Sequence, residues 1–189
     1  MQLEILRAIQ SIASPALDVL MECVTVLGES AVIMLAFCAV YWCVDKKLGR
    51  YLAASMCASV CFNGIVKDFA KAPRPIGEPG IISHRVETAT GYSFPSGHTQ
   101  SITAFCASLF LAVKKTGLRA AMILLPLLVG FSRLYLGVHY PADVLGGLAF
   151  GWLVSLLLPK TDWISAVRYA LVAFAATGGW PWIFVKIKL

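Results

Sequence analysis

Three cationic side chains could together bind one phosphate group. Lys67, Arg74 and Arg133 belong to segments that a membrane topology brings to the same face, as set out below. Three cations that meet at one place repel one another unless an anion lies between them. Arginine offers paired donors that match phosphate oxygens, and lysine adds a point charge. We therefore expect these three residues to bind an anionic phosphate.

The segment Pro95–His98 offers further groups for a phosphate. Pro95 precedes an expected helix start, where free backbone N–H groups and the positive end of the helix dipole favour an anion. Gly97 allows close approach to the backbone, and the Ser96 hydroxyl adds a donor. No carboxylate cluster suited to Mg²⁺ accompanies these residues in the sequence. We therefore expect neither a metal nor another cofactor, with the cations alone neutralising the phosphate charge.

Two histidines and one aspartate remain for covalent and proton chemistry. His139 and Asp143 are four residues apart at an expected helix start, so their side chains share one face. Asp143 can accept a hydrogen bond from one imidazole nitrogen and leave the other as a nucleophile directed at phosphorus. His98 can protonate the leaving oxygen and later activate water. This arrangement predicts hydrolysis through a phosphohistidine intermediate without a metal ion.

The three segments together resemble the signature of the type 2 phosphatidic acid phosphatase (PAP2) family. All parts are present in order and at the family's spacing: Lys67-x6-Arg74-Pro75, Pro95-Ser96-Gly97-His98 and Ser132-Arg133-x5-His139-x3-Asp143. The resemblance implies a membrane helical bundle that hydrolyses phosphate monoesters or pyrophosphates of lipids on the extracytoplasmic side. It implies His139 as the nucleophile, Asp143 as its orienting partner and His98 as the acid. The implied phosphate-binding residues are Lys67, Arg74, Ser96, Gly97 and Arg133.

The expected substrate is a membrane lipid phosphate. The short chain, with a surface helix before its first span, is also similar to bacterial undecaprenyl pyrophosphate phosphatases of the same family, on architecture alone. We therefore expect a polyprenyl pyrophosphate first, then phosphatidylglycerol phosphate or phosphatidate. Alternatives are a lipid phosphotransferase, a vanadium-dependent haloperoxidase, which resembles a soluble protein, and a non-enzymatic lipid-binding or scrambling protein. The paired histidines argue against the last, because binding alone needs only cations.

The composition of the 189-residue chain indicates a membrane protein. Apolar residues make up 59% and charged residues only 14%, whereas soluble domains carry about 25% charged residues. These values exclude a disordered chain, a disulfide-stapled miniprotein and an ordinary cytosolic enzyme. The net charge of +6 is spread over short clusters between apolar runs, which favours a lipid bilayer over nucleic acid as the partner. The six cysteines form no CxxC pair, so we expect free thiols and no zinc site.

The apolar runs predict an all-α, polytopic membrane bundle of about six transmembrane helices in a single domain over residues 1–189. Helices are expected because lipid cannot satisfy free backbone groups. A short amphipathic helix at residues 1–12 precedes them and is expected to anchor on the membrane surface. Glycines in the fifth span indicate close helix packing. The expected spans are 16–43, 49–68, 97–114, 119–136, 142–159 and 164–185.

Six spans bring all three chemical segments to one membrane face. The 72–95 loop is the one long connection, and loops of this length are usually functional. Lysine and arginine at 45–50 and 114–119 place those turns in the cytoplasm by the positive-inside rule. We therefore expect a multi-pass protein of the cell membrane, with its active site on the extracytoplasmic face. The sequence carries no signal for an oligomeric state.

Acidic residues early in the first span form a further polar stripe. Asp18, Glu22 and Glu29 fall on one helical face together with Thr25. We expect this stripe to face the bundle interior or the membrane interface and to pair with nearby cations. The alternative is that Glu22 or Glu29 tunes a catalytic histidine or lines the headgroup path. His84, in the long loop, is expected at the surface, with substrate gating as its alternative role.

Overall fold

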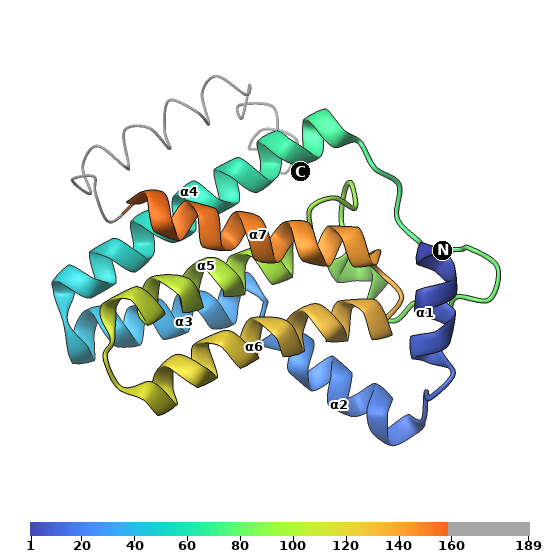
Figure 1. The fold of residues 1–189 in the computed structure, drawn as a ribbon, viewed down its shortest axis with the longest axis horizontal. Coiled ribbons are helices and arrows are strands. Elements are labelled where there is room, and N and C mark those ends of the chain that lie inside the picture. The colour runs from blue at the N-terminus through green and yellow to red at the C-terminus, as the bar shows by residue number, and fades with distance from the viewer. Residues whose placement is uncertain (159–189) are drawn as a thin grey trace, which may run out of the picture.

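The computed structural model describes residues 1–158, which fold into a bundle of long helices (Figure 1). All secondary structure in this range is helical, as the sequence predicts. The helices are α1 (Gln2–Gln10), α2 (Pro15–Val26), α3 (Ser30–Ala39), α4 (Lys46–Ala70), α5 (Gly97–Ala112), α6 (Thr116–Tyr135) and α7 (Pro141–Leu157). A π-helical turn (η1, Val40–Val44) extends α3, and a 3₁₀ turn (η2, Val86–Thr88) interrupts the long loop.

Helix α5 lies at the centre of the bundle, where it packs against α4, α6 and α7. Small residues on α7 permit this approach. A Cβ added at Gly151 would come within 2.6 Å of Thr103 Cβ, and one at Gly147 within 2.9 Å of the Ser96 carbonyl oxygen. These contacts confirm the close helix packing predicted at the two glycines. The N-terminal end of α5, which carries the expected phosphate-binding segment, is thereby fixed against α7.

The first predicted span, 16–43, is wrong as a single helix. Residues 27–29 separate α2 from α3. At this break, a Cβ added at Gly28 would come within 2.8 Å of Val129 Cγ1 and 3.1 Å of His98 Cβ. Hydrophobicity continues across the break, so the apolar run did not reveal it. The consequence is that the backbone of residue 28 passes directly beside the candidate catalytic acid.

Two helices, α4 and α6, are long and apolar enough to cross a bilayer. Helices α1 and α2 meet the same criterion only as a pair bent by 120°, and shorter apolar helices occur at Ser30–Val44 and Pro141–Leu157. Residues 1–158 therefore contain two to three candidate spans, and the total of about six stays a prediction. The expected span 164–185 lies outside the described residues.

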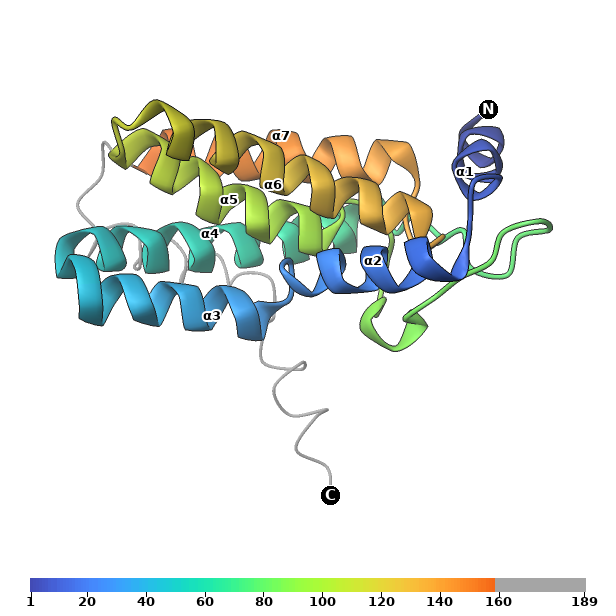
Figure 2. The same ribbon diagram turned by 90° about the horizontal axis from the view of Figure 1, so that it is seen from below.

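Helix α1 lies across one end of the bundle, where it holds the long loop (Figures 1 and 2). Leu6 is fully buried. Arg7 donates a hydrogen bond to the Pro79 carbonyl at 2.7 Å, and Gln10 donates one to the Ile82 carbonyl at 2.6 Å. The amphipathic helix predicted at the N-terminus therefore forms, but anchoring to a membrane is not its only structural role.

The acidic stripe of α2 also holds the long loop. Glu29 forms an ion pair with Arg85, at 2.6 Å between Oε1 and Nη2. Glu22 lies 3.8 Å from His84 Nδ1, and Asp18 accepts a hydrogen bond from a tyrosine hydroxyl of α6. These contacts confirm that the stripe pairs with nearby cations. They also join α2 to the loop that borders the site.

Candidate active site

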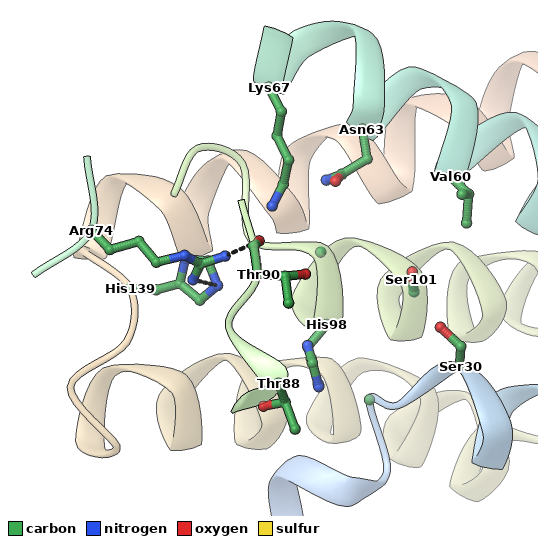
Figure 3. A pocket seen from close by; sticks show the side chains of 12 residues that line it. Ser30, Val60, Asn63, Lys67, Arg74, Thr88, Thr90, His98, Ser101 and His139 are labelled. Atoms are coloured by element: carbon green, nitrogen blue, oxygen red, sulfur yellow. Dashed lines mark hydrogen bonds between the residues drawn. The ribbon is translucent and has the colours of Figure 1, made fainter. Parts of the chain in front are cut away.

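A cavity of about 250 Å³ lies between α4, α5 and the long loop (Figure 3). Five of the eight predicted site residues line it, so the structure brings together segments that are distant in the sequence. Its lining consists of Gly28, Ser30, Val60, Asn63, Lys67, Arg74, Thr88, Thr90, Gly97, His98, Ser101 and His139. Of this lining, Asn63 and the serine and threonine residues were not predicted, because isolated small polar residues carry no spacing signal.

The His139 ring is fixed in one tautomer by its two neighbours. Its Nδ1 lies 3.4 Å from Asp143 Oδ2, and its Nε2 lies 3.1 Å from Arg74 Nη1 (Figure 3). A guanidinium group can only donate hydrogen bonds, so Nε2 must be the acceptor and the ring proton must lie on Nδ1. The free electron pair of Nε2 is therefore directed toward the arginine at the cavity.

Asp143 is held in turn by groups around the start of α7. Ser93 donates a hydrogen bond to Asp143 Oδ2 at 2.5 Å, and the Tyr140 backbone N–H donates to the same oxygen at 2.7 Å. The Ser93 hydroxyl also lies 3.4 Å from His139 Nδ1 and is fully buried. Ser93 was missed by sequence reasoning, because a single serine in a loop resembles any solvated turn residue. The structure shows it linking the aspartate and the histidine.

Burial sets the charge state of His139. The side chain is 2% exposed, and this burial lowers its pKa well below the ordinary histidine value. Arg74 and Arg133 lower the pKa further, whereas the hydrogen bond with Asp143 opposes the shift. The ring is therefore neutral at pH 7, which is the state that a nucleophilic imidazole requires.

The two cations at the cavity are held by carbonyl groups of the long loop. Arg74 Nε donates to Gly91 O at 2.9 Å, and its Nη2 donates to Thr90 O at 2.8 Å. Lys67 Nζ donates to Tyr92 O at 2.8 Å. The residues 90–92 therefore place both positive charges beside the same histidine ring.

The opposite side of the site carries donors that lack partners. Among the described residues, His98 Nε2 and the Nε and Nη2 atoms of Arg133 are buried without a hydrogen-bond partner. Arg133 is fully buried, and its Nη1 donates to Thr25 Oγ1 at 2.9 Å. Buried polar groups are normally paired, so such atoms require an explanation. An anion that accepts hydrogen bonds would supply one.

Three predicted residues lie outside the cavity lining. Arg133 and Asp143 are buried beside it, as described above. The Ser96 hydroxyl lies 2.9 Å from Thr99 Oγ1, and its backbone N–H donates to the Asp143 carbonyl at 3.0 Å. Ser96 thus connects the start of α5 to the start of α7. Within residues 1–158, no group of three or more His, Cys, Asp or Glu side chains could hold a metal ion.

Comparisons with known proteins agree with this geometry. The model of the PAP2 superfamily matches residues 48–165, which is more than half of the chain. A lipid A 1-phosphatase from Rhizobium etli is 32% identical over 139 residues, covering 69% of this chain but only 57% of the relative. Undecaprenyl-diphosphatase BcrC from Bacillus subtilis is 30% identical over 188 residues, covering 91% of this chain and 94% of the relative.

A solved structure shares the fold. The crystal structure of Aquifex aeolicus LpxE aligns with a TM-score of 0.73 and 26% sequence identity, covering 85% of this chain and 95% of that one. The family match includes the three segments that build the site, from Lys67 to Asp143. The chain therefore belongs to the PAP2 superfamily.

Proposed function

We propose that the chain is a metal-independent lipid phosphatase, a single domain over residues 1–189, that works through a phosphohistidine intermediate. The observation that carries this proposal is the orientation of His139. Its Nδ1 proton faces Asp143, and its Nε2 electron pair faces the Arg74 guanidinium at the cavity. A phosphoryl group bound by Arg74 would therefore meet a neutral, oriented nucleophile.

The proposed reaction has two steps. In the first, His139 Nε2 forms a bond to phosphorus while the phosphorus–oxygen bond to the lipid breaks, and His98 donates a proton to the leaving oxygen. In the second, His98 removes a proton from water, the water oxygen attacks phosphorus, and the phosphorus–nitrogen bond breaks. Asp143 keeps the Nδ1 proton throughout and stabilises the positive ring. Inorganic phosphate and a dephosphorylated lipid, or lipid monophosphate from a diphosphate, are the products.

The proposed phosphate-binding residues are Lys67, Arg74, Ser96, Gly97 and Arg133. Support comes from the positions of Lys67 and Arg74 at the cavity and from the unpartnered donors of Arg133 in the described part of the chain. Gly97 lines the cavity at the start of α5, where helix N–H groups favour an anion. Ser96 contributes least directly, because its hydroxyl and its N–H already have protein partners.

The proposed substrates are a polyprenyl pyrophosphate, phosphatidylglycerol phosphate or phosphatidate in the outer leaflet of the cell membrane. The relative named as an undecaprenyl-diphosphatase favours the first, because the match covers nearly the whole of both chains. The relative named as a lipid A 1-phosphatase shows that phosphates of other lipids are recognised within the superfamily. An extracytoplasmic site in a multi-pass protein completes the proposal.

The test is release of inorganic phosphate by the purified full-length chain in detergent with excess chelator. The panel is undecaprenyl diphosphate, phosphatidylglycerol phosphate, phosphatidate and glucose 6-phosphate, each run beside His139→Ala. We expect release from at least one lipid, no inhibition by chelator, and no turnover by the variant at an unchanged unfolding temperature. A requirement for added metal would contradict the mechanism. A new phosphorylated product when lipid alcohols are added would indicate phosphotransfer.

A further inference from the structure

The turn at residues 136–140, which carries His139, is held by donors from outside it. Four consecutive carbonyl groups, those of residues 135–138, each accept a hydrogen bond from another part of the chain. The pairs are Gln10 Nε2 to Tyr135 O at 2.8 Å, His84 N to Leu136 O at 3.0 Å, Ser83 Oγ to Gly137 O at 2.8 Å and Arg74 Nη1 to Val138 O at 3.0 Å.

Three of these donors belong to the long loop, and the fourth belongs to α1. Gln10 is the last residue of α1, and its amide makes three hydrogen bonds. Its Nε2 donates to Ile82 O at 2.6 Å and to Tyr135 O at 2.8 Å, while its Oε1 accepts from Ile82 N at 3.0 Å. One side chain therefore satisfies both backbone groups of a loop residue and a carbonyl in the last turn of α6.

A glycine allows Gln10 to reach this position. Gly137 has a φ of +64°, in the left-handed region that favours glycine. A Cβ there would come within 2.9 Å of Gln10 Nε2 and would overlap the Ile82 carbonyl oxygen. The turn, the loop and the amide of α1 are therefore in direct contact, two residues before His139.

We propose that Gln10 is a positioning residue for His139, which makes α1 part of the catalytic scaffold as well as a surface helix. This inference rests on the proposed function, because it takes His139 as the nucleophile. Without Gln10, the loop and the end of α6 lose their shared clip, and the turn is free to shift relative to Arg74 and the cavity. Displacements of about 1 Å can cost about a hundredfold in rate.

The test compares Gln10→Ala with Arg7→Ala in the full-length chain. Arg7 is a matched control, because it binds the loop at the Pro79 carbonyl from the same helix but makes no hydrogen bond to the turn. With undecaprenyl diphosphate and phosphatidate, we expect Gln10→Ala to lower kcat by about ten- to a hundredfold while KM changes little. We expect Arg7→Ala to stay near the wild-type kcat.

A second variant separates the amide donor from the acceptor. Gln10→Glu keeps an acceptor for Ile82 N but loses the donor to Ile82 O and Tyr135 O, and it sets a carboxylate against two carbonyl oxygens. We expect a fall in kcat at least as large as for Gln10→Ala. Hydrogen exchange gives a readout that does not depend on activity. Gln10→Ala should speed exchange of the 134–140 amides, whereas Arg7→Ala should affect only the loop.

Each outcome bears on the inference. Equal losses of kcat in Gln10→Ala and Arg7→Ala would show that α1 only stabilises the loop, and would overturn it. Wild-type kcat in Gln10→Ala would overturn it as well, while leaving the proposed function intact. If the wild-type chain released no phosphate from any lipid of the panel, the proposed function would fail, and the catalytic role of Gln10 would fail with it.

Discussion

The two sides of the cavity treat their polar groups in opposite ways. On the side of the 136–140 turn, both ring nitrogens of His139 have partners, and Asp143 accepts from Ser93 and from the Tyr140 backbone. On the side of α5 and α6, His98 Nε2 and two donor atoms of Arg133 have no partner among the described residues. One side is complete in the protein alone, and the other has donors to spare.

This difference separates two tasks. The orientation of the nucleophile is fixed by folding, so no part of the substrate is needed to align His139. The unpartnered donors are costly by themselves, at about 1–3 kcal/mol for each buried group. An anion that accepts from them would remove this cost, so the same atoms that destabilise the folded chain would favour phosphate binding. We therefore assign covalent chemistry to the first side, and charge binding and proton transfer to the second.

The largest expected effect divides the two histidines. His98→Gln removes the proposed acid, and lipid phosphate hydrolysis should fall by about 10²- to 10⁴-fold. With p-nitrophenyl phosphate, whose leaving group needs no proton, the variant should still phosphorylate His139. Its slow hydrolysis of the phosphohistidine should then give a burst of one nitrophenolate per protein, measured by rapid-mixing absorbance.

The matched control is His84→Gln, which removes a histidine of the long loop that pairs with Glu22 and does not line the cavity. It should behave as the wild type with both substrates. The comparison breaks down if His98→Gln loses both substrates equally and shows no burst, because His98 would then serve the nucleophilic step itself.

A smaller effect is expected at Ser93, which completes the side that carries His139. Ser93→Ala removes the hydrogen bond to Asp143 Oδ2 and leaves the aspartate less firmly oriented. We expect kcat to fall about tenfold, which corresponds to about 1.4 kcal/mol, the worth of one such hydrogen bond. Initial rates of phosphate release measure this effect.

Ser108→Ala is the control for that experiment. Ser108 is as buried as Ser93 and hydrogen-bonds Ser55 Oγ at 2.8 Å, within the α4–α5 contact and outside the cavity lining. Both variants lose a buried hydroxyl, but only one loses contact with Asp143. An equal decrease in kcat for the two variants would mean that general destabilisation, and not orientation of the aspartate, explains the Ser93 effect.

The residues that carry charge were accessible from the sequence, because few functions justify three cations and two histidines between apolar runs. Lys67, Arg74, Gly97, His98 and His139 line one cavity as the motif spacing predicted. The helical class and the positions of α4 to α7 followed from hydrophobic length within a few residues. The family resemblance is confirmed by the match over residues 48–165.

The supporting contacts were not accessible, because they depend on how the loop and α1 fold onto the bundle. Ser93 and Gln10 act through single hydrogen bonds between distant segments, and neither has a periodic or charged signature. The break at residues 27–29 was hidden for a related reason. The apolar run continues through it, and the cause is the close approach of Gly28 to Val129, a tertiary contact.

The smallest expected effect is a change of stability with pH that belongs to His139 alone. Its pKa in the folded chain is lowered by burial, whereas in the unfolded chain it returns to about 6.5. Below pH 6.5 the unfolded state therefore binds more protons, so the folded state loses stability as the pH falls, by up to about 1.4 kcal/mol per pH unit from this group. His139→Gln stays neutral and lacks this loss. Unfolding temperatures between about pH 7.5 and pH 5 should therefore fall more steeply for the wild type than for the variant, since the other histidines titrate in both. Parallel curves would mean that His139 is already protonated in the folded protein, and the completed side of the cavity would then hold a cation in place of a nucleophile.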